Sequence, residues 1–316
     1  MQAKDVELLH KLCQIFAPSG NEVLMKEFLL DYVAQNQEHW KIKPQIIQGE
    51  HFQDGFLLVF GKPRTVVFAH MDSIGFMVRY EKELVRIGGT VAKTGYKLIG
   101  KDSFGDISCQ IKLQKSNKKH KKEQKLLTYD FDRKIETGTE LVFECDFRET
   151  PDFVQSCYLD NRLGILNVLK LAENLENGVI AFSCWEETAG GSVGYLAKYI
   201  ADHYAVKQAL ISDITWITKG VKHGKGVVIS LRDSLVPRRS YVQKIIALAK
   251  KSGIDFQLEV EEFGGSDAKD LQRSDYAWDW CFVGAAEEHV HSPNEMVHKH
   301  DAVCMFELYQ YLFENL

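Results

Sequence analysis

Two adjacent glutamates, Glu186 and Glu187, follow a strongly apolar run, Val179-Ile-Ala-Phe-Ser-Cys-Trp185, and precede a glycine-rich turn. Such a run is typical of a buried strand in a mostly parallel sheet. Open α/β sheets bind their ligands at the carboxyl ends of these strands. Because neighbouring side chains of an extended chain point to opposite faces, one carboxylate could bind a metal while the other carries a proton. A solvated strand end is the simpler interpretation of the pair taken alone.

Acidic and imidazole side chains also follow four other apolar runs. The segments are His70-Met-Asp72 after 65–69, Asp160-Asn-Arg162 after 157–159, Asp213 after 209–212, and His289-Val-His291 after 280–284. Because the strand ends of one parallel sheet meet at one edge, we expect these side chains to share a single cleft. Crowded carboxylates repel one another unless a cation neutralises them, so the clustering indicates a bound metal.

Oxygen and nitrogen ligands without thiolates suit zinc, cobalt or manganese. The candidates exceed what one catalytic zinc takes, and a shared carboxylate would make a two-metal site. Taken singly, His70 could be a core histidine, Asp160 a helix N-cap and Asp213 a turn residue. Asp72, two residues from His70, has the spacing to orient that histidine. Arg162 and Lys225 are candidate cationic accessories, although surface solvation is the simpler account of each.

The elements that must position these residues alternate between strands and helices. Helices are expected at 161–175, 192–204, 239–252 and 300–315, and strands at 56–60, 65–69, 179–186, 208–213, 226–231 and 278–285. This alternation predicts an α/β fold, a three-layer sandwich with a mostly parallel central sheet. Near the N-terminus, a helix ending at about Phe16 precedes a second one that Ser19 or Asn21 could cap.

Between residues 73 and 150 the pattern changes to short alternating runs at 75–80, 84–87, 106–111 and 140–144, which predict a small all-β insertion domain. The catalytic domain would then be discontinuous, comprising 1–72 and 151–316, and the insertion could serve oligomerisation or substrate access. The basic segment 115–122 contains no aromatic residue, which favours a solvated hairpin loop over a nucleic-acid patch.

The composition excludes several classes of protein. The 316 residues carry a net charge of −5, which argues against a general nucleic-acid binder. The seven cysteines are scattered and odd in number, and the N-terminus lacks a signal-like apolar core, so we expect a reducing cytoplasm. No apolar run is long enough to cross a bilayer.

An ordered set of motifs resembles the glutamyl-aminopeptidase and tetrahedral-aminopeptidase family of metallopeptidases, nearly end to end. The motifs are Pro18-Ser-Gly-Asn-Glu22, Ala69-His-Met-Asp72 with Ile74-Gly-Phe-Met-Val78, Leu159-Asp-Asn-Arg162, Glu186-Glu187, Gly224-Lys-Gly226, Gly264-Gly-Ser-Asp-Ala268 and His291-Ser-Pro293. Their order and spacing carry the resemblance. It implies an aminopeptidase that acts on short peptides with two divalent metal ions per subunit and assembles as a homo-oligomer.

The resemblance also implies a role for each ligand. Asp160 would bridge the two metals; His70 and Asp213 would complete one, and Glu187 and His291 the other. Glu186 would be the general base that takes a proton from a metal-bridging water and passes it to the leaving amine.

The chain departs from the family pattern at three places. Ser73 stands where the family commonly has an acidic residue, and the turn Thr188-Ala-Gly-Gly-Ser192 replaces the usual Val-Gly pattern. The insertion is short and lysine-rich, which leaves the family's dodecamer open here. In the loop 264–268, Gly265, Ser266 and Asp267 are candidates for substrate binding, with a glycine turn that caps the next helix as the alternative.

Two other functions compete with the aminopeptidase. A related two-metal N-acyl amino acid deacylase or carboxypeptidase would use the same sheet and metals but tolerate a blocked amino terminus. A non-catalytic metal-binding scaffold is the third hypothesis, and only Ser73 and the turn after Glu187 favour it.

Overall fold

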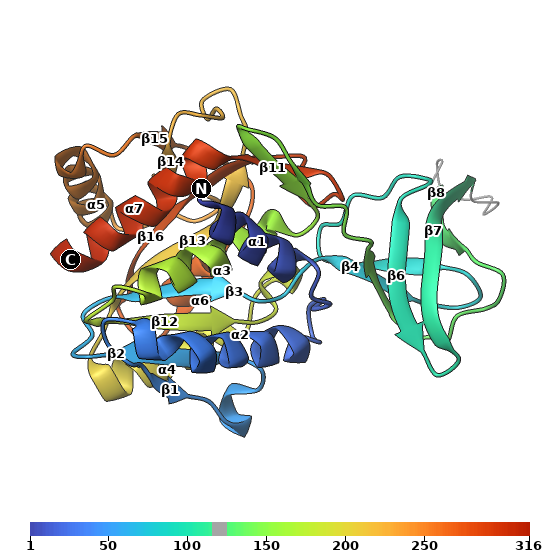
Figure 1. Cartoon of the computed structure of the whole chain (residues 1–316), viewed down its shortest axis with the longest axis horizontal. Coiled ribbons are helices and arrows are strands. Elements are labelled where there is room, and N and C mark those ends of the chain that lie inside the picture. Colours follow the sequence, from blue (N-terminus) through green and yellow to red (C-terminus); the bar gives the residue numbers. More distant parts are fainter. Residues whose placement is uncertain (116–124) are drawn as a thin grey trace.

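The computed structural model describes residues 1–115 and 125–316. Apart from Lys115, the basic segment 115–122 lies outside these residues. Helices and strands form a mixed α/β fold around one large sheet, and a smaller sheet lies to its side (Figure 1). No helix in the described part of the chain combines the length and apolar character needed to span a membrane.

The large sheet has eleven strands. From one edge they are β1 (Gln45–Ile47), β2 (Phe56–Phe60), β12 (Gly178–Ser183), β3 (Val66–His70), β13 (Gln208–Trp216), β16 (Asp279–Glu288), β17 (Glu295–His298), β11 (Phe153–Ser156) and β10 (Arg148–Glu149), while β14 (Val227–Ser230) pairs with β16 and β15 (Phe256–Glu259) with β14. Parallel pairing joins β12, β3, β13 and β16, and also β14 with β15. The remaining pairs are antiparallel, so the sheet is mixed, and the expected parallel arrangement is confined mainly to its centre.

Helices cover both faces of this sheet because its central strands are apolar on both sides. In β3, Val67 and Ala69 pack into one cluster and Val66 and Phe68 into another, as alternation along a strand requires. The first cluster includes α1 (Ala3–Cys13), α2 (Val23–Asn36), α3 (Leu159–Ala172), α5 (Arg239–Ser252) and α7 (Lys299–Asn315), and the second includes α4 (Ser192–Tyr204) and α6 (Ala268–Arg273). Short 3₁₀ turns, η1 (Gln37–His39), η2 (Glu50–Phe52) and η3 (Glu186–Thr188), complete the helical elements.

The smaller sheet lies within the segment 73–150. Its order is β5 (Leu84–Ile87), β4 (Gly75–Val78), β9 (Glu140–Phe143), β6 (Lys97–Asp102), β7 (Gly105–Lys115) and β8 (Lys125–Asp130), and all its pairs are antiparallel. Phe76, Leu98, Ile111 and Phe143 pack in its own apolar cluster. The division of the chain into a catalytic domain and an insertion domain stays a prediction.

Candidate metal centre and substrate cleft

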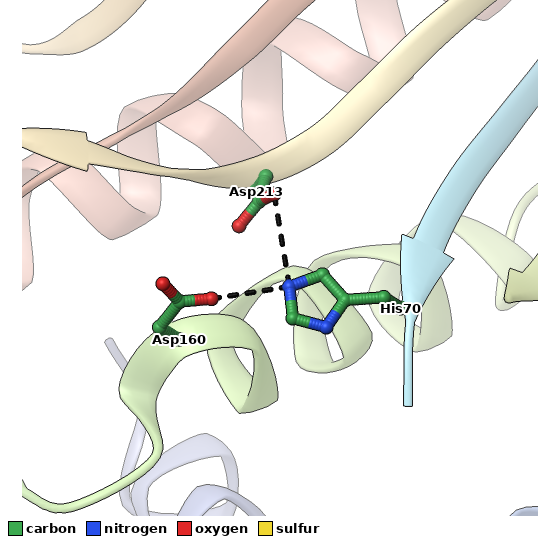
Figure 2. A group of neighbouring side chains, drawn as sticks. All are labelled: His70, Asp160 and Asp213. Atoms are coloured by element: carbon green, nitrogen blue, oxygen red, sulfur yellow. Dashed lines mark hydrogen bonds and ion pairs between the residues drawn. The ribbon is translucent and has the colours of Figure 1, made fainter. Parts of the chain in front are cut away.

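The five side chains predicted as metal ligands lie together in two groups that share Asp160. Ligand atoms of His70, Asp160 and Asp213 lie within 4.8 Å of one another, as do those of Asp160, Glu187 and His291. His70 Nε2 lies 3.1 Å from Asp160 Oδ1 and 3.7 Å from Asp213 Oδ2, and Figure 2 shows both carboxylates directed at the same ring nitrogen. His291 Nε2 lies 3.4 Å from Asp160 Oδ2 and 3.1 Å from Glu187 Oε2. Each oxygen of Asp160 therefore faces a different histidine.

Asp160 reaches this position from a helix. The expected strand at 157–159 is wrong: β11 ends at Ser156, and Asp160 lies in the first turn of α3, where its backbone is not yet helical. The segment after Ser156 is buried by packing with both the large and the small sheet, so it is apolar without being a strand. Asp160 therefore approaches the strand ends from the helical layer.

Asp213 lies inside a strand. The sequence predicts it at a strand end, but β13 continues to Trp216, and Asp213 lies opposite Gly284 of β16. A Cβ atom at Gly284 would come within 2.0 Å of the Asp213 backbone oxygen. Glycine at that position therefore allows the two strands to pair closely beside the ligand.

Glu186 and Glu187 lie on the 3₁₀ turn η3 and not in extended chain, so the argument from strand alternation is wrong for this pair. Trp185 before the turn and Ala189 after it have left-handed backbone conformations. The backbone N–H of Glu186 donates to Asp72 Oδ1 at 3.1 Å, and that of Glu187 donates to Asp72 Oδ2 at 3.2 Å. The position of both glutamates is thus tied to Asp72.

Asp72 also contacts His70. His70 Nδ1 lies 3.3 Å from Asp72 Oδ1, while Ser19 Oγ donates to Asp72 Oδ2 at 2.5 Å. Ser19 therefore binds the aspartate and does not cap α2, which begins after Glu22 without a side-chain cap. Ser73, the first departure from the family pattern, is buried and donates to the backbone oxygen of Ala17 at 3.1 Å.

The donor set fits divalent cations. Glu187 Oε1 is buried and has no hydrogen-bond partner among the described residues. Burial, reinforced by the charge of Asp160, raises the pKa of Glu187 to about 7. Burial also raises the pKa of Asp213, again with Asp160 adding to the effect. Carboxylates that repel one another in a buried site are those that a bound cation would stabilise.

Four of the five candidate ligands, Asp160, Glu187, Asp213 and His291, line a cleft with a volume of about 280 Å³. Glu186 lines the same cleft and is half-buried. Burial raises the pKa of Glu186 well above its usual value; His70 opposes this shift, and Asp213 and Glu187 add to it. A carboxylate with a raised pKa suits proton transfer near neutral pH.

Only part of the loop 264–268 lines this cleft. Gly264 and Gly265 line it. Ser266 is buried, donates to Asp233 Oδ2 at 3.1 Å and accepts from the N–H of Ala268 at 3.3 Å. Asp267 is buried and accepts from Ser183 Oγ at 2.5 Å. The two side chains thus contact the protein around the cleft, while the glycine backbone faces it.

Two supporting features were missed from the sequence, Glu295 and Gly88-Gly89. Glu295 is buried; its Oε1 accepts from the N–H of His291 at 2.9 Å and its Oε2 from the N–H of Asp160 at 3.3 Å. Its place four residues after His291 was the available signal. Arg162 is fully buried, which excludes surface solvation, and it donates to the backbone oxygen of Met71. Lys225 is exposed and does not line the cleft.

The second missed feature is Gly88-Gly89, which follows β5 and contacts two ligands. A Cβ atom at Gly89 would come within 2.7 Å of His291 Nδ1, and one at Gly88 within 3.1 Å of the Glu187 backbone oxygen. The N–H of Val91 donates to the backbone oxygen of His291 at 2.9 Å. The segment 73–150 therefore touches the metal centre.

Known peptidases resemble this chain in fold and in sequence. An aminopeptidase from the archaeon Desulfurococcus kamchatkensis has the same fold, with a TM-score of 0.82 and 21% identity over 99% of this chain and 95% of that chain. The TET1 peptidase of Pyrococcus horikoshii gives a TM-score of 0.80 and 22% identity over 99% of this chain and 100% of that chain. A relative in Acetivibrio thermocellus, provisionally named an aminopeptidase, is 27% identical over 93% of this chain and 94% of its own length. Residues 121–308 match the M42 glutamyl aminopeptidase family, and the chain belongs to that family of metallopeptidases.

Proposed function

We propose that this aminopeptidase uses two divalent cations, zinc, cobalt or manganese, to release N-terminal amino acids from short peptides. One observation carries the proposal: Asp160 presents one oxygen to His70 and the other to His291, and Glu186 lines the same cleft. This is the arrangement that a bridging carboxylate requires. His70 and Asp213 would hold one cation, and Glu187 and His291 the other.

Bound divalent cations would acidify a water molecule and polarise the scissile carbonyl. The chain's own contribution to proton transfer is Glu186, which accepts the proton and delivers it to the leaving nitrogen. Asp72 positions both the ligand His70 and the base Glu186, because it contacts the His70 ring and accepts a hydrogen bond from the backbone N–H of Glu186. Orientation of ligands by such partners typically improves metal affinity about 10- to 100-fold.

We further propose a homo-oligomeric assembly. The Pyrococcus horikoshii TET1 peptidase can assemble into a tetrahedron or a large octahedral shell, and it covers nearly the whole of this chain in comparison. The smaller sheet of segment 73–150 would serve this assembly or the access of substrate. A cytoplasmic location remains a prediction.

Release of amino acids by metal-reconstituted protein tests the proposed activity. The protein would be stripped with chelator, reloaded with zinc, cobalt or manganese, and assayed on amino-acid amides with free and N-acetylated amino groups. We expect turnover of free-amine substrates only. Turnover confined to N-acetylated substrates would support the deacylase instead, and absence of turnover with every metal would favour the non-catalytic scaffold.

A further inference from the structure

The cleft contains a second set of carboxylates beyond the metal centre. Asp233, Glu259 and Glu261 line the same cavity as Glu186 and four of the candidate ligands. Asp233 is 8% exposed and Glu259 is 4% exposed. Glu259 Oε1 accepts from Thr215 Oγ1 at 2.5 Å, and Asp233 accepts from Ser266 and from the N–H of Leu235 at 2.6 Å. These hydrogen bonds hold the carboxylates in the wall of the cleft.

Among the described residues, no lysine or arginine side chain is paired with a carboxylate of this set, and the charge of Arg232 only partly opposes the rise in the pKa of Asp233 that burial causes. None of the residues that line the cavity is lysine or arginine. Arg232, adjacent to Asp233, donates its Nε to the backbone oxygen of Asp233 at 2.8 Å and not to the carboxylate. Burial raises the pKa of Glu259 despite its hydrogen bonds with Thr215 and Ser230, and Glu261 and Asp233 add to the shift. The carboxylates therefore repel one another in a site that a cation would stabilise.

The rest of the wall suits a long side chain. Trp216, Phe263 and Phe282 line the cleft alongside the carboxylates. An aliphatic stem can pack against such apolar groups while its charged end reaches a carboxylate, as lysine and arginine do on protein surfaces. A carboxylate side chain placed there would meet like charges.

The cleft is identified as a binding site independently of Asp233, Glu259 and Glu261. Four candidate metal ligands also line it, and Glu187 Oε1, on a side chain only 2% exposed, has no hydrogen-bond partner among the described residues. The cleft thus contains a position for the reacting group and, beside it, an acidic pocket.

Resting on the proposed aminopeptidase function, we infer that the substrate's N-terminal residue is lysine or arginine, bound by Asp233, Glu259 and Glu261. The carboxylates attract the cationic end, and the apolar wall holds the stem. This preference is opposite to the one that the name of the glutamyl aminopeptidase family suggests.

Specificity constants for a series of aminoacyl amides test this inference. We expect kcat/KM of metal-loaded protein for lysyl and arginyl amides to exceed that for the leucyl amide by at least about tenfold, and that for the glutamyl amide by more. Best turnover of leucyl or glutamyl amide would overturn the inference and leave the aminopeptidase function intact. Turnover of none of the amides would overturn the proposed function and the inference with it.

Substitution separates the pocket from general effects on folding. Glu259→Gln and Glu261→Gln should each lower the ratio of kcat/KM for lysyl over leucyl amide about tenfold. Glu262→Gln is the matched control, because Glu262 is adjacent, exposed and absent from the cleft lining. An unchanged ratio in both pocket variants would overturn the assignment of these carboxylates.

Discussion

Asp72 Oδ1 accepts a hydrogen bond from the backbone N–H of Glu186 at 3.1 Å, and the same carboxylate contacts His70 Nδ1 at 3.3 Å. One buried aspartate therefore fixes the histidine of one ligand group and the turn that carries the candidate base. Its other oxygen accepts from Glu187, a residue of the second ligand group. The two groups are consequently positioned together and not as separate sites.

We expect Asp72→Asn to weaken metal binding about 10- to 100-fold, because an amide would place N–H donors against the donors that now surround the carboxylate. The change also leaves buried donors unsatisfied and should lower the free energy of unfolding by about 1–3 kcal/mol. Metal titration and denaturant unfolding measure the two effects. Ser19→Ala removes only one donor to Asp72 and should be milder. Equal metal affinity in the aspartate variant and the unsubstituted protein would contradict this role.

Glu295→Gln should also weaken metal binding, although Glu295 is not expected to touch a metal. Each of its carboxylate oxygens accepts a backbone N–H of a ligand, Asp160 or His291, and the amide of glutamine can accept only one. We expect about a tenfold loss in affinity by analogy with other residues that orient metal ligands. Glu288→Gln, a half-exposed carboxylate on β16, serves as the control. If both variants bind metal equally well, Glu295 does not position the ligands.

Gly89→Ala should displace His291. The added Cβ would lie 2.7 Å from His291 Nδ1, which is too close for unstrained packing. We expect loss of metal affinity and activity, measured by metal titration and by turnover of an amino-acid amide. Gly194→Ala in α4 is the matched control, because a Cβ there meets nothing within 4 Å. That change should stabilise the helix by up to about 1 kcal/mol. Wild-type metal affinity in Gly89→Ala would contradict the proposed contact.

Metal binding should release protons. Burial lowers the pKa of His291, but hydrogen bonds with Asp160 and Glu187 outweigh it and raise the pKa to about 12 in the metal-free protein. The pKa of His70 is raised as well, because Asp213 and Asp160 outweigh burial. The raised pKa values favour the protonated form of both imidazoles, and a protonated imidazole must lose a proton to bind metal. Metal affinity should therefore rise with pH and fall on acidification.

Calorimetric titration of metal-free protein with zinc at pH 7, in buffers of different ionisation enthalpy, measures this release. We expect at least about two protons per chain if both histidines coordinate, because Glu187, whose pKa is raised to about 7, also binds metal as the carboxylate. An enthalpy independent of the buffer would show that the histidines are not protonated ligands.

Much of the fold is predictable from the sequence, because the apolar runs of β2, β3 and β12 are buried on both faces and have few other possible structures. Helices α3, α4, α5 and α7 are predictable because their apolar residues recur at helical spacing. The proximity of the five candidate ligands was also predictable, because each polar segment follows an apolar run, with residues 285–288 standing between the run 280–284 and His289. The strand pairings near this edge of the large sheet were not predictable, because short strands such as β10 and β17 carry little pattern of their own.

Details of the site depended on contacts between distant segments. The apolar residues before Asp160 resemble a strand, and only their packing between the two sheets shows that they are not one. Glu295 accepts from Asp160, 135 residues away, and its place four residues after His291 does not by itself predict this contact. Gly89 resembles an ordinary turn glycine until His291 is placed beside it.

The most direct test of the central claim compares Glu186→Gln with Glu187→Gln for both turnover and bound metal. Glu186→Gln should retain two cations per chain while kcat/KM falls at least about 100- to 10,000-fold, because the proton acceptor is lost. Glu187→Gln should lose metal affinity, since it removes a charged ligand. Metal content by elemental analysis and hydrolysis of a lysyl amide give both values from one preparation. Full turnover in Glu186→Gln, or loss of metal from that variant, would contradict the account.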